Sequence, residues 1–165
     1  LLFKDVIESE LRSPLVIAWA TIGFGVLLAI ADRFKGQRRD EYTLGLRDVL
    51  VVGCMQALAL IPGTSRSGIT MTAGLLLGLT REAASRFSFL LAIPTILMSS
   101  ILVTKDLIEA SEPVNWQDLG LGVVLSFAAA YACIHYFLKF IERIGMVPFV
   151  VYRLLLGVVI LALVL

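Results

Sequence analysis

Residues 62–70 are the part of this sequence whose residue types and spacing best suit chemistry. They read Pro-Gly-Thr-Ser-Arg-Ser-Gly-Ile-Thr, which combines a helix breaker, two glycines, four hydroxyl side chains and one arginine. Apolar runs flank them at residues 49–61 and 69–79. An arginine near the centre of a bilayer costs about 3 kcal/mol, so it is rarely kept there without a partner. A guanidinium surrounded by hydroxyls and flexible backbone best suits a phosphate-like anion.

The glycines of this stretch allow backbone to approach a ligand closely, and its hydroxyls and arginine supply donors. A second short helix is expected to begin near residue 67 or 68, so its free N–H groups and the positive end of its dipole point into the tip. Together these features predict an anion site at half the depth of the membrane, as in transporters with broken helices. Its residues are Gly63, Ser65, Arg66, Ser67, Gly68 and Thr70.

Several polar residues allow two interpretations. Ser65, Ser67 and Thr70 either bind the anion or cap the second short helix, and we expect at least one of them to cap it. Gln56 either faces the cavity or only bridges two helices, and the sequence favours neither. Arg153 lies about two turns into the last apolar run, where it either reaches the site or snorkels to the interface, and we favour snorkelling.

Other reactive side chains are interpreted as structural. His135 is the only histidine and lies late in an apolar run. Glu82 and Arg86 are four residues apart, which is typical of local support on a helix. Cys54 and Cys133 lie in apolar runs and are expected to be small buried hydrophobes, because their positions fit neither a disulfide framework nor a metal site.

The composition indicates an integral membrane protein. The chain has 165 residues, of which 59% are hydrophobic and 16% charged, and its mean hydropathy is +0.93. Soluble domains have about 45–50% apolar and about 25% charged residues. The formal net charge of +1 comes with no basic face interleaved with aromatics, so no nucleic-acid partner is expected. We expect one integral membrane domain over residues 1–165.

The apolar runs predict an all-α fold with about four full transmembrane helices and one pair of short helices. A membrane helix needs about 20 residues, and four runs come near that length. They are residues 15–31, 87–104 with Pro94 as a kink, 119–138 and 147–165. The runs at 49–61 and 69–79 are too short to span. Residues 1–13 mix charged and apolar side chains, which is typical of an interfacial amphipathic segment.

The charges of the loops favour a re-entrant hairpin at about residues 46–80. If the two short runs enter and leave on one side, loops 32–48, 80–86 and 139–146 share a face and hold nearly all the loop Lys and Arg. Loop 105–118, with one Lys and four acidic residues, then lies on the other face, as the positive-inside rule requires. If the runs cross as one broken helix, the basic loops fall on opposite sides.

Residues 56–70, reading Gln-Ala-Leu-Ala-Leu-Ile-Pro-Gly-Thr-Ser-Arg-Ser-Gly-Ile-Thr, resemble the second signature of the bacterial undecaprenyl-diphosphate phosphatases, also called bacitracin-resistance proteins. The likeness continues through residues 81–94 and resumes at Pro148-Phe149 and Tyr152-Arg153. It covers essentially the whole chain.

The resemblance implies a multi-pass enzyme of the bacterial inner (plasma) membrane that removes the terminal phosphate of undecaprenyl diphosphate, recycling the lipid carrier of peptidoglycan synthesis. It implies two inverted repeats, each with a re-entrant helix pair. Arg66 would hold the diphosphate beside Ser65 and Ser67 as catalytic residues, with Gly63, Gly68, Thr70 and Gln56 binding substrate. A divalent cation, Mg²⁺ or Ca²⁺, is expected, although its ligands are not evident here. The expected partners are the lipid substrate and membrane lipids, and whether the protein forms a homodimer is left open.

The first signature of the family is not found in this sequence. That signature has a Glu-x-x-x-Glu element and a Pro-x-Ser-Ser-x-Gly-His element, whereas Glu8 and Glu10 have the wrong spacing and His135 the wrong place. We therefore expect the chain to be the C-terminal part of such an enzyme, holding half an active site. The alternative is a transporter or lipid translocase that uses the same tip as an anion site.

Overall fold

The computed structural model describes residues 13–33, 36, 38–109 and 115–164, and these residues are mostly helical, with no β-strand among them. Four helices are long and apolar enough to cross a membrane: α2 (Pro14–Asp32), α5 (Arg81–Glu109), α6 (Trp116–Ile144) and α7 (Val147–Val164). The all-α polytopic fold is therefore confirmed. The amphipathic segment predicted at residues 1–13 lies outside the described residues except for Ser13, whose hydroxyl accepts from the N–H of Val16 and caps α2.

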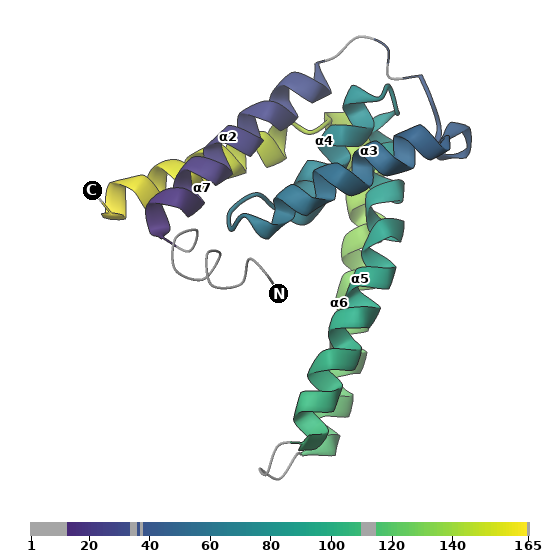
Figure 1. Cartoon of the computed structure of the whole chain (residues 1–165), viewed down its shortest axis with the longest axis vertical. Coiled ribbons are helices and arrows are strands. Elements are labelled where there is room, and N and C mark those ends of the chain that lie inside the picture. The colour runs from purple at the N-terminus through teal and green to yellow at the C-terminus, as the bar shows by residue number, and fades with distance from the viewer. Residues whose placement is uncertain (1–12, 34–35, 37, 110–114, 165) are drawn as a thin grey trace.

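The two short apolar runs form separate short helices. α3 (Leu46–Ala57) continues into the 3₁₀ turn η2 (Leu58–Leu60), and α4 (Arg66–Leu76) runs back beside it (Figure 1). Residues 61–65, which include Pro62 and Gly63, form the tip between them. Because Pro cannot donate within a helix and Gly63 has a φ of 91°, the chain turns here instead of continuing.

The helices form two arms that meet at α4. Helices α2 and α7 lie side by side as one arm, while α5 and α6 form a long pair that leaves at a steep angle (Figure 1). The α2–α7 contact is close because Gly157 has no side chain, and a Cβ there would clash with Ile22. Gly25 likewise faces Arg153, which shows that the two helices run antiparallel.

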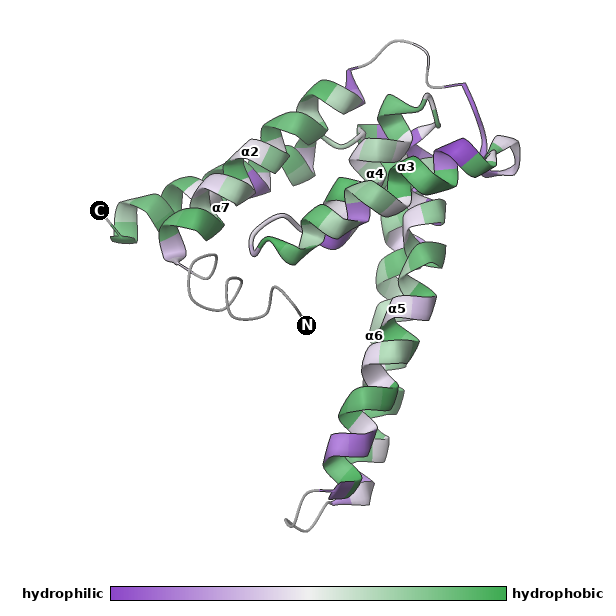
Figure 2. Ribbon diagram, in the orientation of Figure 1, coloured by the Kyte–Doolittle hydropathy of each residue, from purple (hydrophilic) through white to green (hydrophobic). Residues whose placement is uncertain are grey.

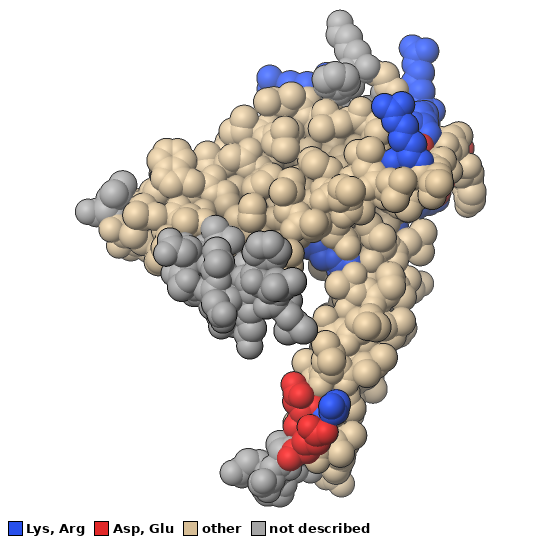
Figure 3. Space-filling view, viewed as in Figure 1, with Lys and Arg blue, Asp and Glu red and all other residues tan. Residues whose placement is uncertain are grey.

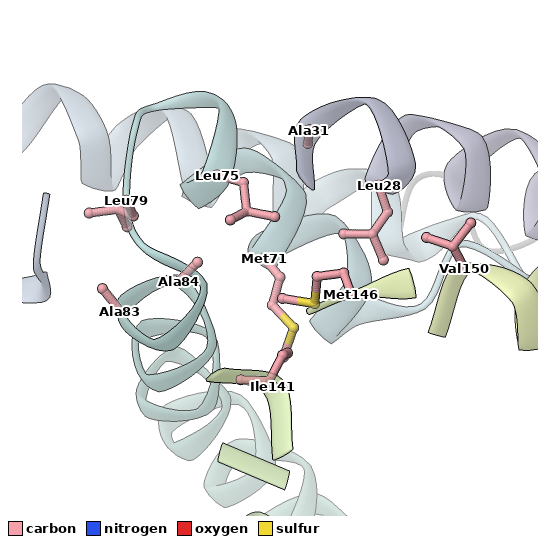
Figure 4. Close-up of a cluster of buried hydrophobic side chains, with 10 residues drawn as sticks. All are labelled: Leu28, Ala31, Met71, Leu75, Leu79, Ala83, Ala84, Ile141, Met146 and Val150. Carbon is pink, nitrogen blue, oxygen red and sulfur yellow. The ribbon is translucent and has the colours of Figure 1, made fainter. Parts of the chain in front are cut away.

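A cluster of buried apolar side chains joins the arms (Figure 4). It draws on α2, α4, α5, α6 and α7, so it fixes the base of α4 against every spanning helix. Its members are Leu28, Ala31, Met71, Leu75, Leu79, Ala83, Ala84, Ile141, Met146 and Val150.

Both ends of the α3–α4 hairpin are tied together at its base. The N–H groups of Arg38 and Arg39 donate to Gly78 O at 3.1 and 3.0 Å, and Thr80 N–H donates to Arg39 O at 2.9 Å. The Arg39 guanidinium also pairs with Asp48 at 2.6 Å and donates to Leu77 O at 3.0 Å. Because the chain leaves beside the point where it entered, the hairpin has the shape that membrane re-entry requires. Re-entry itself stays a prediction.

Many large apolar side chains of the α5–α6 arm and of the other helices are exposed. The ribbons of these helices are mostly coloured as hydrophobic (Figure 2). This corrects the prediction for the cysteines, because Cys54 and Cys133 are both exposed and free. An apolar run in a spanning helix faces lipid as readily as protein, so hydropathy alone does not predict burial within the fold.

Candidate anion and lipid site

Ser65 begins the site because it is the N-cap of α4. Its hydroxyl accepts from the N–H of Gly68 at 3.3 Å, and its carbonyl accepts from the N–H of Ile69 at 3.0 Å. The N–H groups of Arg66 and Ser67 come before these and have no acceptor within the helix. Ser65 has a φ of 65°, the only positive value at a non-glycine residue in the described part of the chain. Such strain clusters at functional sites, where surrounding structure enforces it.

The tip packs against α2 through Gly63. A Cβ at this position would clash with the carbonyl oxygen of Ile17 and lie 3.0 Å from Thr21 Oγ1. The Thr21 hydroxyl donates to Ile17 O at 2.7 Å and lies 3.2 Å from Gly63 O. Gly63 therefore shapes the loop by letting the tip backbone reach a spanning helix.

Arg153 is buried at the tip, and the prediction that it snorkels is wrong. It is 7% exposed, donates from Nη2 to Gly63 O at 2.7 Å and from Nε to Thr21 O at 3.4 Å. A Cβ on Gly68 would lie 2.9 Å from Arg153 Nη1 and 3.2 Å from Ser65 Oγ. The absent side chain of Gly68 thus lets this guanidinium approach the N-terminus of α4. Arg153 does not extend to the membrane interface because its guanidinium donates to the carbonyls of Gly63 and Thr21 within the fold.

Arg66 points to the other side of the α4 N-terminus. It donates from Nε to Gln56 Oε1 at 3.3 Å and from Nη2 to Leu91 O in α5 at 2.8 Å. Gln56 bridges α3 and α4 through this bond, and it does not line either cavity described below. Leu91 lies next to Leu90, whose carbonyl loses its helical donor because the residue four positions on is Pro94.

Thr70 connects α4 to α5. Its hydroxyl is 2.6 Å from the Ser88 hydroxyl and within 3.1 Å of the carbonyls of Arg66 and Ser67. It is 1% exposed, so these contacts occupy it in this structure. Its predicted contact with substrate stays a prediction, and so do the catalytic roles of Ser65 and Ser67. Sequence reasoning missed Ser88, which lies within an apolar run and carries no local signal of a contact with α4.

Two cavities meet at the α4 N-terminus. The larger, of about 620 Å³, lies between α2, α6 and α7, and the smaller, of about 240 Å³, lies against α5. Arg153 lines the larger and Arg66 the smaller, whereas Ser67 and Phe89 line both. The polar wall of the larger cavity consists of Thr21, Gly63, Ser65, Ser67, Gly68, Tyr152 and Arg153.

Glu82, Arg86 and His135, which were interpreted as structural, do not line either cavity. Arg86 pairs with Glu82 one turn earlier and with Glu41 at 3.0 Å, so the predicted local support by Glu82 and Arg86 is confirmed. His135 is exposed and contacts the ring of Tyr136 edge-on.

The described residues do not by themselves fit a divalent cation. Mg²⁺ and Ca²⁺ take oxygen ligands, above all carboxylates. No group of three or more His, Cys, Asp or Glu residues comes together in the part of the chain that the structure describes. The cation expected from the resemblance stays a prediction, and we assign no step to it.

The described residues around the α4 N-terminus suit an anion, and no proton acceptor lies among those that line the two cavities. Ser67 and the helix N-terminus lie between two cavities, each lined by one guanidinium group, and such donors suit the several oxygens of a phosphate group. No histidine or carboxylate is among the described residues that line the two cavities. These residues can position a phosphate and stabilise its charge, whereas activation of a nucleophile needs a further group.

Comparison with known proteins gives close matches over nearly the whole chain. A family model described as bacitracin resistance protein BacA matches residues 1–159. "Undecaprenyl-diphosphatase 2" of Stutzerimonas stutzeri is 63% identical over 166 residues, which cover 99% of this chain and 62% of that protein. "Undecaprenyl-diphosphatase" of Nitrosococcus oceani is 61% identical over 157 residues, which cover 95% of this chain and 59% of that protein. The chain thus spans about 60% of the length of these curated relatives.

Proposed function

Because the chain belongs to the bacitracin resistance protein BacA family, we propose that it serves in the hydrolysis of undecaprenyl diphosphate to undecaprenyl phosphate and inorganic phosphate. The names of the two relatives state this activity for those proteins. The reaction would take place in the bacterial inner (plasma) membrane, regenerate the lipid carrier of peptidoglycan synthesis and thereby confer bacitracin resistance.

The observation that carries the proposal is the pair of arginines on either side of Ser67. Arg153 and Arg66 line separate cavities that share this serine, so a diphosphate lying across the α4 N-terminus would meet one guanidinium at each end. Phosphoryl transfer depends mainly on positioning and on neutralising charge over the phosphate oxygens. In this proposal Arg66 exchanges its contacts with Gln56 and Leu91 for phosphate oxygens, while the free N–H groups of α4 bind further oxygens.

The described residues would thus supply binding and charge stabilisation. Ser65 and Ser67 are both exposed at the tip, so either hydroxyl can contact a phosphate. The acceptor for the proton of the nucleophile would come from outside the described cavity walls. A divalent cation bound to the diphosphate is part of the proposal, with no ligand assigned.

Phosphate release from undecaprenyl diphosphate tests the function. We would assay the purified chain in detergent, alone and joined to the remaining part of the Stutzerimonas stutzeri relative. Arg66→Ala is expected to lower kcat by about 100-fold or more, the usual effect of removing a donor to developing transition-state charge. Arg66→Lys is also expected to impair turnover, because a point charge cannot form the two-pronged contact. Arg143→Ala, at an exposed arginine, is the matched control.

The outcomes separate the proposal from its rival. Release that fails in Arg66→Ala and persists in Arg143→Ala supports the phosphatase. Movement of labelled lipid across vesicles with no phosphate released, by the chain alone and by the joined protein, would favour the translocase and overturn it. Near-normal turnover in Arg66→Ala would contradict the site.

A further inference from the structure

The residues that line the larger cavity include, besides the polar wall, apolar groups towards each end of α2 and α7, and we call the spaces beside these groups the two apolar compartments. Because α2 and α7 are antiparallel, Ile17 and Ile160 lie at one end and Leu28 and Phe149 at the other. Ile17 and Leu28 are eleven residues apart, which is about 16 Å along a helix. The anion-binding wall lies between these ends, since Thr21 and Arg153 contact Gly63 there. A ligand that fills this cavity would place a polar group against the polar wall and a hydrocarbon portion against an apolar end.

The two apolar compartments differ in their walls. The end near the start of α7 is lined by three aromatic rings, from Phe89 in α5, Phe137 in α6 and Phe149 in α7. The Phe137 ring is edge-on to both others, with centroids 5.6 Å from Phe89 and 5.0 Å from Phe149. The opposite end has only aliphatic residues from α2 and α7. Aromatic rings bury a large apolar area, so this group of three packs well against an apolar chain.

We propose that the aromatic compartment, defined by Phe89, Phe137 and Phe149, is the subsite for the first isoprene units of the lipid substrate. The inference rests on the function proposed above for the phosphate end of the same molecule. The ligand is inferred from charge and polarity. The guanidinium of Arg153 favours an anionic group, and the apolar wall beside it favours a hydrocarbon chain. Phe89 lines both cavities, so the subsite begins directly beside the phosphate position.

The size of the cavity limits how much of the lipid it holds. About 620 Å³ lies within the roughly 300–1,000 Å³ of small-molecule sites, so a long polyprenyl chain fits only in part. The remainder would lie in the bilayer, against the apolar outer surface of the helices. We therefore expect the subsite to select for the structure of the chain near the diphosphate rather than for its full length.

Two free cysteines supply a test of binding that does not depend on turnover. Cys133 lines the larger cavity one turn before Phe137, whereas Cys54 is exposed on α3 and lines neither cavity. Undecaprenyl phosphate should slow the reaction of Cys133 with a membrane-permeant maleimide by about tenfold and leave Cys54 unchanged. Inorganic diphosphate and undecaprenol serve as probes of the head and of the tail alone. Diphosphate should leave the rate at Cys133 unchanged.

Substitutions then test selectivity in the protein that releases phosphate. Phe137→Ala removes both ring contacts and should lower kcat/KM for undecaprenyl diphosphate by about tenfold, since apolar pockets discriminate by such factors. Phe127→Ala, on the lipid-facing side of the same helix and 72% exposed, is the matched control. Because Phe137 also packs against the buried apolar cluster, Cys133→Trp is a second variant that narrows the cavity from an exposed position. Its partner control is Cys54→Trp.

The outcomes distinguish this inference from the proposed phosphatase. Protection of Cys133 without any phosphate release would keep the subsite and overturn the activity. Phosphate release without protection of Cys133, or with equal protection of both cysteines, would overturn the subsite and keep the activity. A loss of kcat/KM in Cys133→Trp that equals the loss in Cys54→Trp would also overturn it. The absence of both phosphate release and protection of Cys133 would overturn both.

Discussion

At the tip, the guanidinium of Arg153 occupies the space that a side chain at Gly68 would otherwise fill. Gly68 lies in the first turn of α4, and Arg153 reaches it from the last helix because no Cβ stands in the way. The guanidinium is held by the carbonyls of Gly63 and Thr21, which are 90 and 132 residues away along the chain. The charge is therefore directed by backbone atoms rather than by an acidic partner, which leaves its electrostatic potential available for an anion.

Gly68→Ala is expected to separate activity from stability. The added Cβ would lie 2.9 Å from Arg153 Nη1, so the guanidinium must move away from the α4 N-terminus. The same change raises helix propensity by about 1 kcal/mol. We expect phosphate release to fall by at least about tenfold while the melting temperature in detergent stays equal or rises. Gly53→Ala, in α3 with open space around it, should raise stability and leave activity unchanged. A joint loss of both properties in Gly68→Ala would contradict this account.

Arg153→Lys should lower kcat/KM by about 100-fold although it keeps the charge. Lysine cannot direct one nitrogen to Gly63 and present another to a ligand in a fixed plane. Loss of one preorganised donor commonly lowers turnover by about 100-fold or more. Steady-state phosphate release and thermal unfolding of the same preparations give the comparison, with Arg143→Lys as control. Full turnover in folded Arg153→Lys would show that the guanidinium only braces the tip.

The sequence predicts the tip well and its partners poorly. Local chemistry within nine residues identifies Gly63, Ser65, Arg66, Ser67 and Gly68, because helix breakers and hydroxyls act on their own neighbours. Arg153 and Thr21 enter the site only through packing between distant helices, which no local pattern encodes. The sequence signals for Arg153 are its depth within an apolar run and the family resemblance at Tyr152-Arg153.

At the scale of elements, the apolar runs predict the four spanning helices, and the structure extends most of them. α5 begins at Arg81 and ends at Glu109, beyond the predicted run of 87–104, and it passes through Pro94 without ending. Charged residues fit in a helix where it leaves the apolar layer, so hydropathy underestimates length. The close approach of α2 and α7 depends on Gly25 and Gly157. The sequence does not predict this contact, because the two glycines lie far apart along the chain and meet the opposite helix only in the folded protein.

The ion pair at the base of the hairpin should make stability depend on pH. A hydrogen bond from Arg39, with a second from the N–H of Gly45, holds the pKa of Asp48 below its usual range. A carboxylate with a lowered pKa stabilises the fold above its unfolded value of about 4 and loses that effect as pH falls through the folded value. We expect Asp48→Asn to lower the melting temperature at pH 7, and the gap to wild type to close below about pH 4.

The exposed Asp40 supplies the control for this prediction. It lies in the segment before α3, so Asp40→Asn changes the net charge equally without removing the bond between Asp48 and Arg39. Thermal unfolding in detergent from pH 3 to pH 7 gives both curves. A gap between Asp48→Asn and wild type that persists unchanged at pH 3 would show that the pair does not hold the hairpin.

Over the whole molecule, the charges separate along the α5–α6 arm. Figure 3 shows Lys and Arg gathered around the end where α3 and α4 lie, and Asp and Glu at the far end of the α5–α6 arm. The acidic group includes Asp106, Glu109 and Asp118. Together with the bridge between Arg39 and Leu79, this distribution places both ends of the hairpin on the basic side. The positive-inside rule then assigns that side to the cytoplasm.

Cysteine labelling of intact cells decides between a re-entrant hairpin and a broken spanning helix. In a background with Cys54→Ala and Cys133→Ala, we would place single cysteines by Arg38→Cys, Arg143→Cys and Gln117→Cys, all at exposed positions. A re-entrant hairpin leaves two crossings, α5 and α6, between residues 38 and 143, so these two positions share a side. An impermeant maleimide should then label Gln117→Cys from outside and the other two only after lysis. A broken spanning helix adds a third crossing between residues 38 and 143. Residues 38 and 117 would then share one side of the membrane, and residue 143 would lie on the other. That labelling pattern would show that residues 46–80 cross the membrane as one broken helix. It would contradict an anion site at the tip of a re-entrant hairpin.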